Sequence, residues 1–202
     1  QQREAVYKER SEILNDNDIA TRTMEVIEDT AQAQLDKIFA DKDAEESNLK
    51  AVCVRLNALF WPGISRHIEN VQTESELNEV SPALFAEIKK RFTDKVDELG
   101  PDISRQIFRY IFLEVLDNDW KEHLLAMDEL RRGIGLRAIG QKDPLLEYKF
   151  ESFNLFQEML VQIRESITEF ALRVSVATPE QRHSRDNWVE SRDAFDIPTV
   201  SG

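Results

Sequence analysis

Apolar residues in the second half of the chain recur every three or four positions, which is the period of one face of an α-helix. Between Ile103 and Ile134 they are Phe112, Leu116, Trp120, Leu124, Met127, Leu130 and Ile134. This spacing predicts one long helix. Gly133 and Gly135 are expected to end it, because glycine is favoured just beyond a helix C-terminus.

A second long helix is expected to begin at Asp143-Pro144, since aspartate is a good N-cap and proline suits the first helical position. Its apolar positions are Leu146, Phe150, Phe153, Phe156, Leu160, Ile163, Ile167, Phe170 and Val174. This near-heptad spacing favours packing on an antiparallel neighbour. Residues 103–176 are therefore expected to form a long helical hairpin, in which Trp120 and the aromatic residues at the start of the second helix pack between helices rather than line a ligand site.

The first part of the chain, residues 1–39, has the same helical period and predicts one long helix. Its apolar positions are Val6, Ile13, Ile27, Ala31, Leu35 and Ile38. The polar residues from Asn15 to Asp18 interrupt this pattern and are expected to kink or fray the helix.

Residues 40–102 contain most of the turn and cap signals, and predict a small unit of short helices. The signals are Trp61-Pro62-Gly63 as an end, Thr73 with Glu76 as a capping box, Ser81-Pro82 as a helix start and Gly100-Pro101 as a stop. Residues 177–202 are polar and lack periodicity, so they predict a flexible tail, although Trp188, Val189 and Phe195 could dock. The expected fold class is all-α.

Composition narrows the functional classes further. The chain has 202 residues, 41% hydrophobic residues, only six glycines and six prolines, and a net charge of −13. Such an excess of negative charge argues against nucleic-acid binding, which requires local cationic charge. No apolar run approaches the roughly 20 residues that span a bilayer. The single cysteine, Cys53, allows no internal disulfide and fits a reducing compartment.

No catalytic or metal-binding motif is visible. The phosphate-binding pattern GxxxxGK[ST] is absent, and the glycines at 133, 135 and 140 do not form GxGxxG. Glu122-His123 lacks the second histidine four residues away that zinc proteases use. The other histidines, His67 and His183, are far apart in sequence. Cys53 is expected to be a packed residue, since no partners of a nucleophile accompany it. The chain is therefore predicted to be non-enzymatic and to bind no cofactor or metal.

A basic loop between the two long helices is the strongest functional signal. Arg131, Arg132, Arg137 and Lys142 lie in a stretch without a carboxylate. Favourable interaction with a helix C-terminus would account for Arg131 and Arg132. It accounts poorly for the other two cations and for the apolar Leu136 and Ile139 at the tip. Arginine combined with apolar side chains suits contact with a polypeptide surface.

Several sequence runs resemble the C-terminal helical part of SecA, the ATPase that drives preproteins through the bacterial Sec channel. The run QREAVY (2–7) resembles the start of the family's scaffold helix. DWKEHL (119–124), IGLR (134–137), GQKDP (140–144), EYK (147–149), ESF (151–153) and FQEML (156–160) resemble its two-helix finger. The resemblance is strong over 103–176, clear over 1–39 and weak over 40–100, where the family has its helical wing.

The resemblance implies a C-terminal fragment without the motor: scaffold helix 1–39, wing 40–102, finger 103–176 and tail 177–202. The finger tip would be Leu136, Arg137, Ala138, Ile139 and Gly140, with Arg131, Arg132 and Lys142 flanking it. Ile139 stands where the family often has tyrosine, and Ala138 where it often has glycine, which puts any tyrosine-specific role in doubt. In the family the finger contacts the preprotein and the SecY channel and restrains ATP hydrolysis.

The resemblance also implies partners, cofactors and a location. The partners would be the SecA motor domains, the SecYEG channel and unfolded preprotein, with an anionic membrane surface reached only through the full-length protein. ATP and magnesium would belong to the motor. The location would be cytoplasmic, at the inner face of the bacterial plasma membrane. A homodimer is a further expectation, because scaffold surface that normally meets the motor would be exposed.

Two other functional classes stay open at this point. One is a free-standing helical adaptor for protein interactions that never had a motor. The other is a metal-dependent helical enzyme, which elemental analysis for bound zinc or iron would reveal.

Overall fold

A computed structural model describes residues 1–40, 45–137 and 143–175, and side chains within 1–40, 48–134 and 143–175. Within these ranges every regular element is a helix, which confirms the all-α fold class. The elements are α1 (Gln2–Asn15), α2 (Ile19–Leu35), α3 (Glu45–Leu59), the 3-10 helix η1 (Ile64–His67), α4 (Glu74–Leu99), α5 (Pro101–Arg137) and α6 (Pro144–Arg173).

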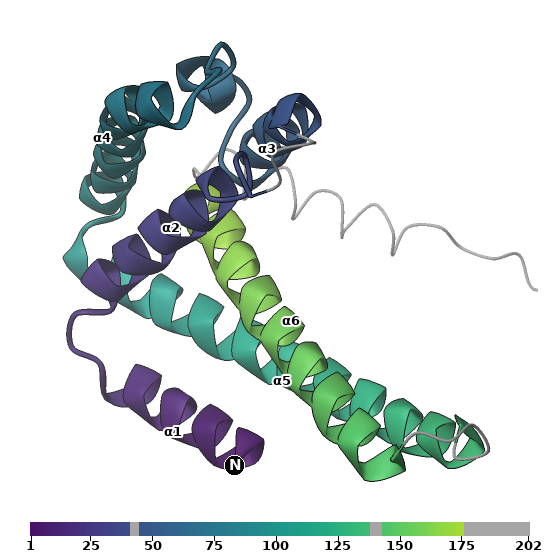
Figure 1. The fold of residues 1–202 in the computed structure, drawn as a ribbon. Coiled ribbons are helices and arrows are strands. Elements are labelled where there is room, and N and C mark those ends of the chain that lie inside the picture. Colours follow the sequence, from purple (N-terminus) through teal and green to yellow (C-terminus); the bar gives the residue numbers. More distant parts are fainter. Residues whose placement is uncertain (41–44, 138–142, 176–202) are drawn as a thin grey trace, which may run out of the picture.

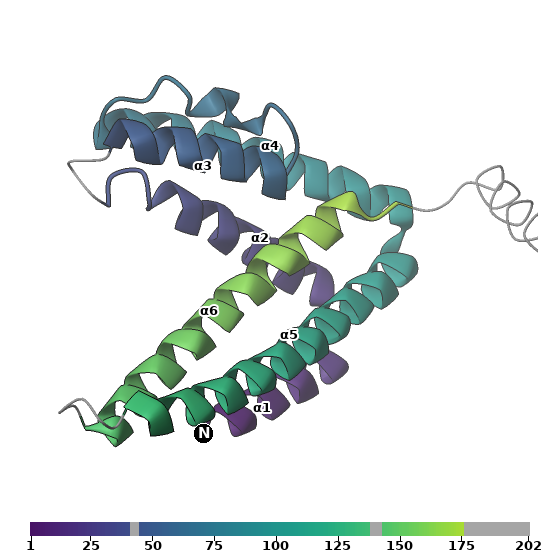
Figure 2. The same ribbon diagram turned by 90° about the vertical axis from the view of Figure 1, so that its right-hand side faces the viewer.

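The two longest helices, α5 and α6, form the expected hairpin (Figure 1). They are close together at the end where α5 stops and α6 begins, and they separate toward the other end, where α2 crosses α6 (Figure 2). The glycine stop predicted at Gly133 and Gly135 is wrong, because α5 continues to Arg137. Ile134 between them is only 8% exposed. Its burial outweighs the cost of about 1 kcal/mol for each helical glycine.

The expected single helix over 1–39 is two helices in the structure. Asp16 is extended, with φ −70° and ψ 120°, and ends α1. The backbone N–H of Asp18 donates to Asp16 Oδ1 (2.8 Å), and Asp18 Oδ1 accepts from the backbone N–H of Thr21 (3.4 Å). These aspartates satisfy backbone groups outside a helix, which is why the polar stretch divides the segment rather than kinking it.

The elements α3, η1 and α4, which we call the wing region after the prediction, lie together on one side of α2 (Figure 2). The Thr73 cap is confirmed, since its Oγ1 accepts from the backbone N–H of Glu76 at 3.2 Å. The predicted start at Ser81-Pro82 is wrong, because α4 begins at Glu74 and passes through Pro82. The buried residues of α4 lie on both sides of this proline: Leu77, Leu84, Ile88, Phe92 and Leu99. Their shared burial holds the helix continuous.

One core connects the wing to the hairpin. At its centre, Phe108 of α5 is fully buried and stacks on Phe92 of α4, with ring centroids 5.4 Å apart. Gly100 joins these helices with a φ of 78°, a conformation that favours glycine. None of the described helices is long and apolar enough to span a membrane.

Candidate protein-interaction site

The far end of the hairpin carries the basic residues that the sequence predicted. Arg131 and Arg132 are exposed, and neither side chain makes a hydrogen bond or ion pair with the described part of the chain. Leu136 and Arg137 occupy the last turn of α5, and their side chains are not described. The other predicted tip and flank residues, Ala138, Ile139, Gly140 and Lys142, lie outside the described residues. The tip therefore stays a prediction.

Beside this end lies a group of large apolar side chains that face solvent, which we call the distal apolar strip. Its members are Leu124 (47% exposed), Leu125 (67%), Leu145 (59%), Leu146 (66%), Phe150 (64%) and Phe153 (59%). Leu146, Phe150 and Phe153 are spaced by four and three residues, so they share one side of α6. Exposed groups of large apolar side chains are typical of interaction surfaces.

The prediction that this stripe packs between the helices is wrong for Leu124, Leu146, Phe150 and Phe153. Phe156 does pack against the core. Toward the hairpin turn, α5 lies along α6 and covers one side of its apolar face, and no other described helix covers the other side (Figure 2). The adjacent leucine pairs at 124–125 and 145–146 were the signal that could have shown this, because neighbouring helical positions lie about 100° apart and widen the apolar face.

Polar contacts of one side chain join α1 to both helices of the hairpin, α5 and α6. Gln2 of α1 donates from Nε2 to the carbonyl of Ser152 on α6 (3.1 Å), and its Oε1 lies 3.2 Å from Nε2 of His123 on α5. His123 is 5% exposed, and its ring stacks on Trp120 and meets the edge of Phe156. Periodicity gave no sign of this contact, because it joins residues far apart in sequence.

Burial lowers the pKa of the His123 imidazole below its ordinary value of about 6.5. The neutral ring is therefore favoured in the folded chain, and its contribution to stability is complete above that pH and decreases as the pH falls below it. Replacing His123 with glutamine should cost more stability at about pH 7.5 than at about pH 5. Urea unfolding of both proteins at the two pH values measures this difference, and an equal cost at both would contradict it.

Carboxylates lie close to His123 on the same side of the hairpin. The test therefore compares two proteins that both keep these carboxylates and differ only at position 123. Burial, and then the neighbouring Glu122, raise the pKa of Asp119, and its Oδ2 is buried without a hydrogen-bond partner in the described chain. Asp119, Glu122 and Glu158 share a shallow pocket with His123. The titration of Asp119 is common to both proteins and largely cancels in the difference.

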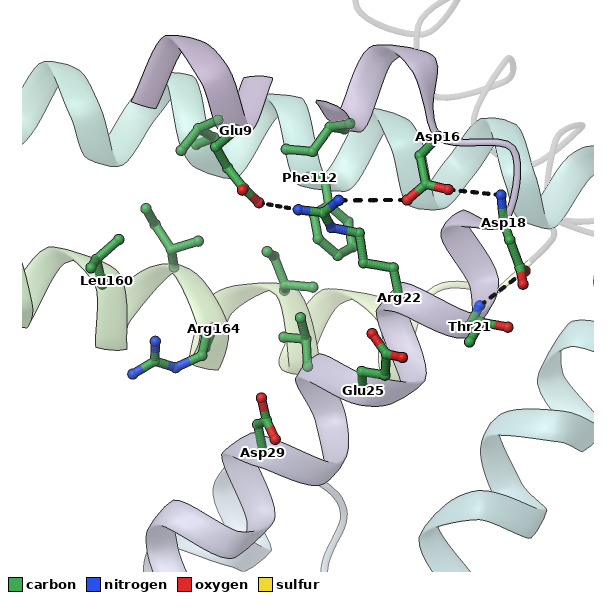
Figure 3. A pocket seen from close by; sticks show the side chains of 15 residues that line it. Glu9, Asp16, Asp18, Thr21, Arg22, Glu25, Asp29, Phe112, Leu160 and Arg164 are labelled. Atoms are coloured by element: carbon green, nitrogen blue, oxygen red, sulfur yellow. Dashed lines mark hydrogen bonds and ion pairs between the residues drawn. The ribbon is translucent and has the colours of Figure 1, made fainter. Parts of the chain in front are cut away.

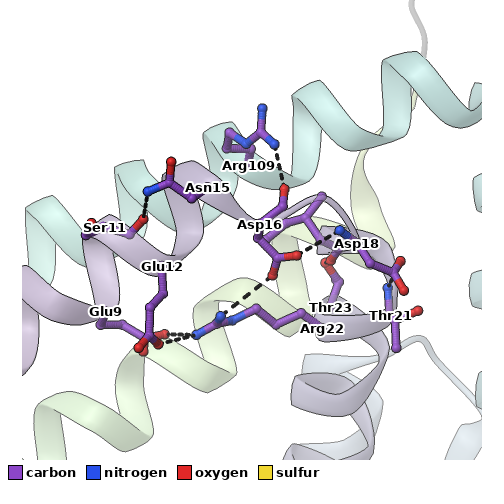
Figure 4. Close-up of polar contacts among 11 residues, drawn as sticks. Glu9, Ser11, Glu12, Asn15, Asp16, Asp18, Thr21, Arg22, Thr23 and Arg109 are labelled. Carbon is purple, nitrogen blue, oxygen red and sulfur yellow. Dashed lines mark hydrogen bonds and ion pairs between the residues drawn. The ribbon is translucent and has the colours of Figure 1, made fainter.

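Arg22 stabilises the turn between α1 and α2 through ion pairs with acidic side chains. Arg22 of α2 lies 2.5 Å from Glu9, 3.6 Å from Asp16 and 4.0 Å from Glu12 (Figure 4). Arg109 of α5 donates from Nη2 to the carbonyl of Asp16 at 2.7 Å. The polar break that replaced the expected continuous helix is thus fixed by cations from two other positions.

A groove of about 570 Å³ lies between this turn and α6 (Figure 3). Buried apolar side chains, including Phe112 and Ile163, form its floor. Glu25 and Asp29 project from α2 beside it and make no hydrogen bond or ion pair within the described ranges. No group of three histidine, cysteine or acidic residues among the described residues could hold a metal ion.

A buried carboxylate links the hairpin to the wing. Glu165 of α6 is 8% exposed, forms an ion pair with Arg55 of α3 and accepts a hydrogen bond from Gln34 Nε2 of α2 at 2.9 Å. Three helices therefore meet at one side chain. A buried charge of this kind requires its partners, because an unpaired carboxylate in the interior is costly.

Two further residues considered in the sequence, Cys53 and His67, are held by packing and by a hydrogen bond, respectively. Cys53 is half-buried against the core, and burial, followed by the charge of Glu69, raises the pKa of its thiol, which opposes the reactive thiolate. Nε2 of His67 forms a hydrogen bond with Oε2 of Glu87 at 2.6 Å, within the wing region. Its hydrogen bond is the largest cause that lowers the pKa of Glu87.

Comparison with known proteins places this arrangement in a family. The family described as the SecA wing and scaffold domain matches residues 1–175. The chain belongs to the SecA family. It is 36% identical to the protein translocase subunit SecA of Pelotomaculum thermopropionicum, over 98% of this chain and 22% of that protein. The corresponding values for SecA of Carboxydothermus hydrogenoformans are 36%, 92% and 21%, and for SecA 1 of Clostridioides difficile 32%, 90% and 20%.

The chain spans about a fifth of the length of these SecA relatives. The match to the wing and scaffold domain confirms the family resemblance drawn from the sequence runs. The matched residues include all the described helices, so all of them belong to the wing and scaffold domain of SecA.

Proposed function

We propose that this chain is the wing, scaffold and two-helix finger of a protein translocase subunit. In that role it couples ATP hydrolysis by motor domains to the movement of preprotein through the SecYEG channel, and restrains the motor. The SecA relatives are each named a protein translocase subunit, and they are about five times as long as the matched region. The contribution of this region is mechanical and regulatory rather than catalytic.

The observation that carries the proposal is the distal end of the hairpin. Arg131 and Arg132, which have no ion-pair partner in the described part of the chain, lie near large exposed apolar side chains there. An unfolded polypeptide offers apolar side chains together with backbone carbonyls and carboxylates, and this surface complements both. The tip residues Leu136, Arg137, Ala138, Ile139 and Gly140 continue the same surface in the proposal, with Lys142 as a further cation.

The proposed surroundings follow from this role. The partners are the motor domains, SecYEG and unfolded preprotein, at the cytoplasmic face of the plasma membrane. ATP and magnesium are bound by the motor, and an anionic membrane surface is met only through the full-length protein. The net charge of −13 opposes nucleic-acid binding. The distal apolar strip would also allow the isolated chain to form a homodimer.

The first test is the ATPase activity of a separately purified SecA motor portion, measured with and without this chain. We expect stable co-elution and lower ATPase activity. A full-length SecA whose wing and scaffold domain is replaced by this chain then tests the tip. Arg137→Glu and Ile139→Gly should each reduce translocation without unfolding the protein, because they change only the charge or apolar bulk of the contact.

Two results would count against the proposal. Wild-type translocation by both tip variants would mean that the tip does no work on the preprotein. Absence of both binding and ATPase repression, in the covalent full-length protein as well as with separate parts, would remove the regulatory role.

A further inference from the structure

A second concave surface lies at the opposite end of α6, where the wing meets the hairpin. This pocket of about 350 Å³ is formed by the end of α3 and the turn after it, by α4 and by the last residues of α6. Trp61 and Phe60 form its aromatic wall, with ring centroids 6.1 Å apart. Asn57 fixes the turn, since its Oδ1 accepts from the backbone N–H groups of Gly63 and Ser65 at 3.0 and 3.2 Å.

The charge of this pocket is opposite to that of the chain. Its lining includes Arg91, Lys95 and Arg173 but no carboxylate, in a protein with a net charge of −13. Glu169 pairs with Arg173 at 2.5 Å, which leaves two cations uncompensated. Lys95 makes no ion pair or hydrogen bond with described residues, and Arg91 makes only a cation–π contact, 4.4 Å above the Trp61 ring.

The aromatic wall also contains a hydrogen-bond donor, the indole N–H of Trp61, without an acceptor among the described residues. Trp61 is 9% exposed, and its Nε1 is buried. A buried donor without a partner is costly, and such groups in native proteins usually have a reason. Cationic and aromatic groups together suit a ligand that carries both carboxylates and apolar rings.

The chain itself contains a segment of this chemistry close by. Residues 186–196 read DNWVESRDAFD and include four acidic residues, one arginine, Trp188, Val189 and Phe195. The segment follows α6 in sequence after twelve residues, 174–185, and the last residues of α6, Leu172 and Arg173, line the pocket. These twelve residues span up to about 40 Å when extended, so the tether is long enough. An extended anionic surface such as a bilayer fits less well, because the net negative charge of the chain repels it.

We infer that residues 186–196 dock in this pocket, with carboxylates at Arg91 and Lys95 and an aromatic ring against the Trp61 side. Because the pocket is built from both the wing and α6, the docked segment ties the wing to the hairpin. A tethered segment experiences an effective concentration in the millimolar range, so a contact with an intrinsic affinity of about 100 μM would be about 90% occupied. This inference is independent of the proposed function, since it concerns only contacts within the chain.

Limited trypsin digestion of the intact chain tests the docking. Arg192 lies inside the docked segment, whereas Arg182 lies before it. The ratio of cleavage at Arg192 to cleavage at Arg182 should be about tenfold lower in the folded chain than in a synthetic peptide of residues 177–202, because cleavage follows the undocked population. Lys95→Glu, and separately Arg91→Gln, should raise the ratio toward that of the peptide.

Lys89→Glu is the matched control, because it makes the same charge change on an exposed position of α4 that does not line the pocket. This control should retain the low ratio. Equal ratios in the wild-type chain and in the free peptide would overturn the inference. So would a low ratio that survives both pocket variants, since the protection would then come from another site. Binding of an added acidic peptide to an otherwise empty pocket would assign the pocket to a separate partner instead.

Discussion

Replacing Phe150 and Phe153 together with glutamine is expected to reduce translocation by about tenfold or more in a full-length SecA that carries this chain as its wing and scaffold domain. Both side chains are more than half exposed, at 64% and 59%, so they add little to folding. Glutamine is a good helix former and keeps α6 intact. Loss of two buried aromatic contacts in a complex typically costs several kcal/mol. The rate of preprotein transport into SecYEG vesicles measures the effect.

Phe170→Gln provides the control, because it makes the same change on the same helix. Its side chain is 51% exposed and lies near the wing end of α6, away from the distal apolar strip. This variant should transport at the wild-type rate. Unchanged transport by the double variant, with unchanged ATPase activity, would show that the distal apolar strip contacts neither the preprotein nor the motor.

The largest expected change in stability comes from Phe108→Ala. Phe108 is fully buried in α5 and stacks on Phe92 of α4, so the substitution leaves a cavity at the junction of wing and hairpin. The expected loss in the free energy of unfolding is about 3–5 kcal/mol. Urea unfolding followed by circular dichroism measures it.

Tyr110→Ala on the same helix is the matched comparison. Its side chain is 65% exposed, so the expected change is within about 0.5 kcal/mol. A loss at Phe108 no larger than the loss at Tyr110 would mean that the wing and hairpin do not share a core at this position.

Local sequence signals predicted the helix ends that depend on a single cap or turn. Thr73, Gly100 and Asp143 each stand where a helix begins or ends in the structure. Pro82 and Gly133 gave the wrong boundaries, because packing of neighbouring residues overrode the local preference. A cap acts through its own backbone, whereas the cost of a helical proline or glycine is weighed against contacts that the sequence does not reveal.

The candidate sites also divide into features visible in the local sequence and contacts that depend on the fold. The basic residues before the hairpin turn were visible as a run of charge, and Arg131 and Arg132 have no ion-pair partner among the described residues. The exposure of Phe150 was not foreseeable from periodicity, which identifies an apolar face but not how many neighbouring helices cover it. The contacts made by Gln2, Arg22 and Glu165 join helices distant in sequence, and only the fold brings those partners together.

The length of α5 gives a geometric amplification. Its 37 residues extend roughly 55 Å at about 1.5 Å per residue, from Pro101 beside α4 to Arg137 at the basic end of the hairpin. A rotation of only about 6° around the wing end would carry the other end through about 5.4 Å, the rise of one helical turn. If the hairpin acts on a polypeptide as proposed, a rearrangement too small to disturb the core around Phe108 would advance that polypeptide by one to two residues.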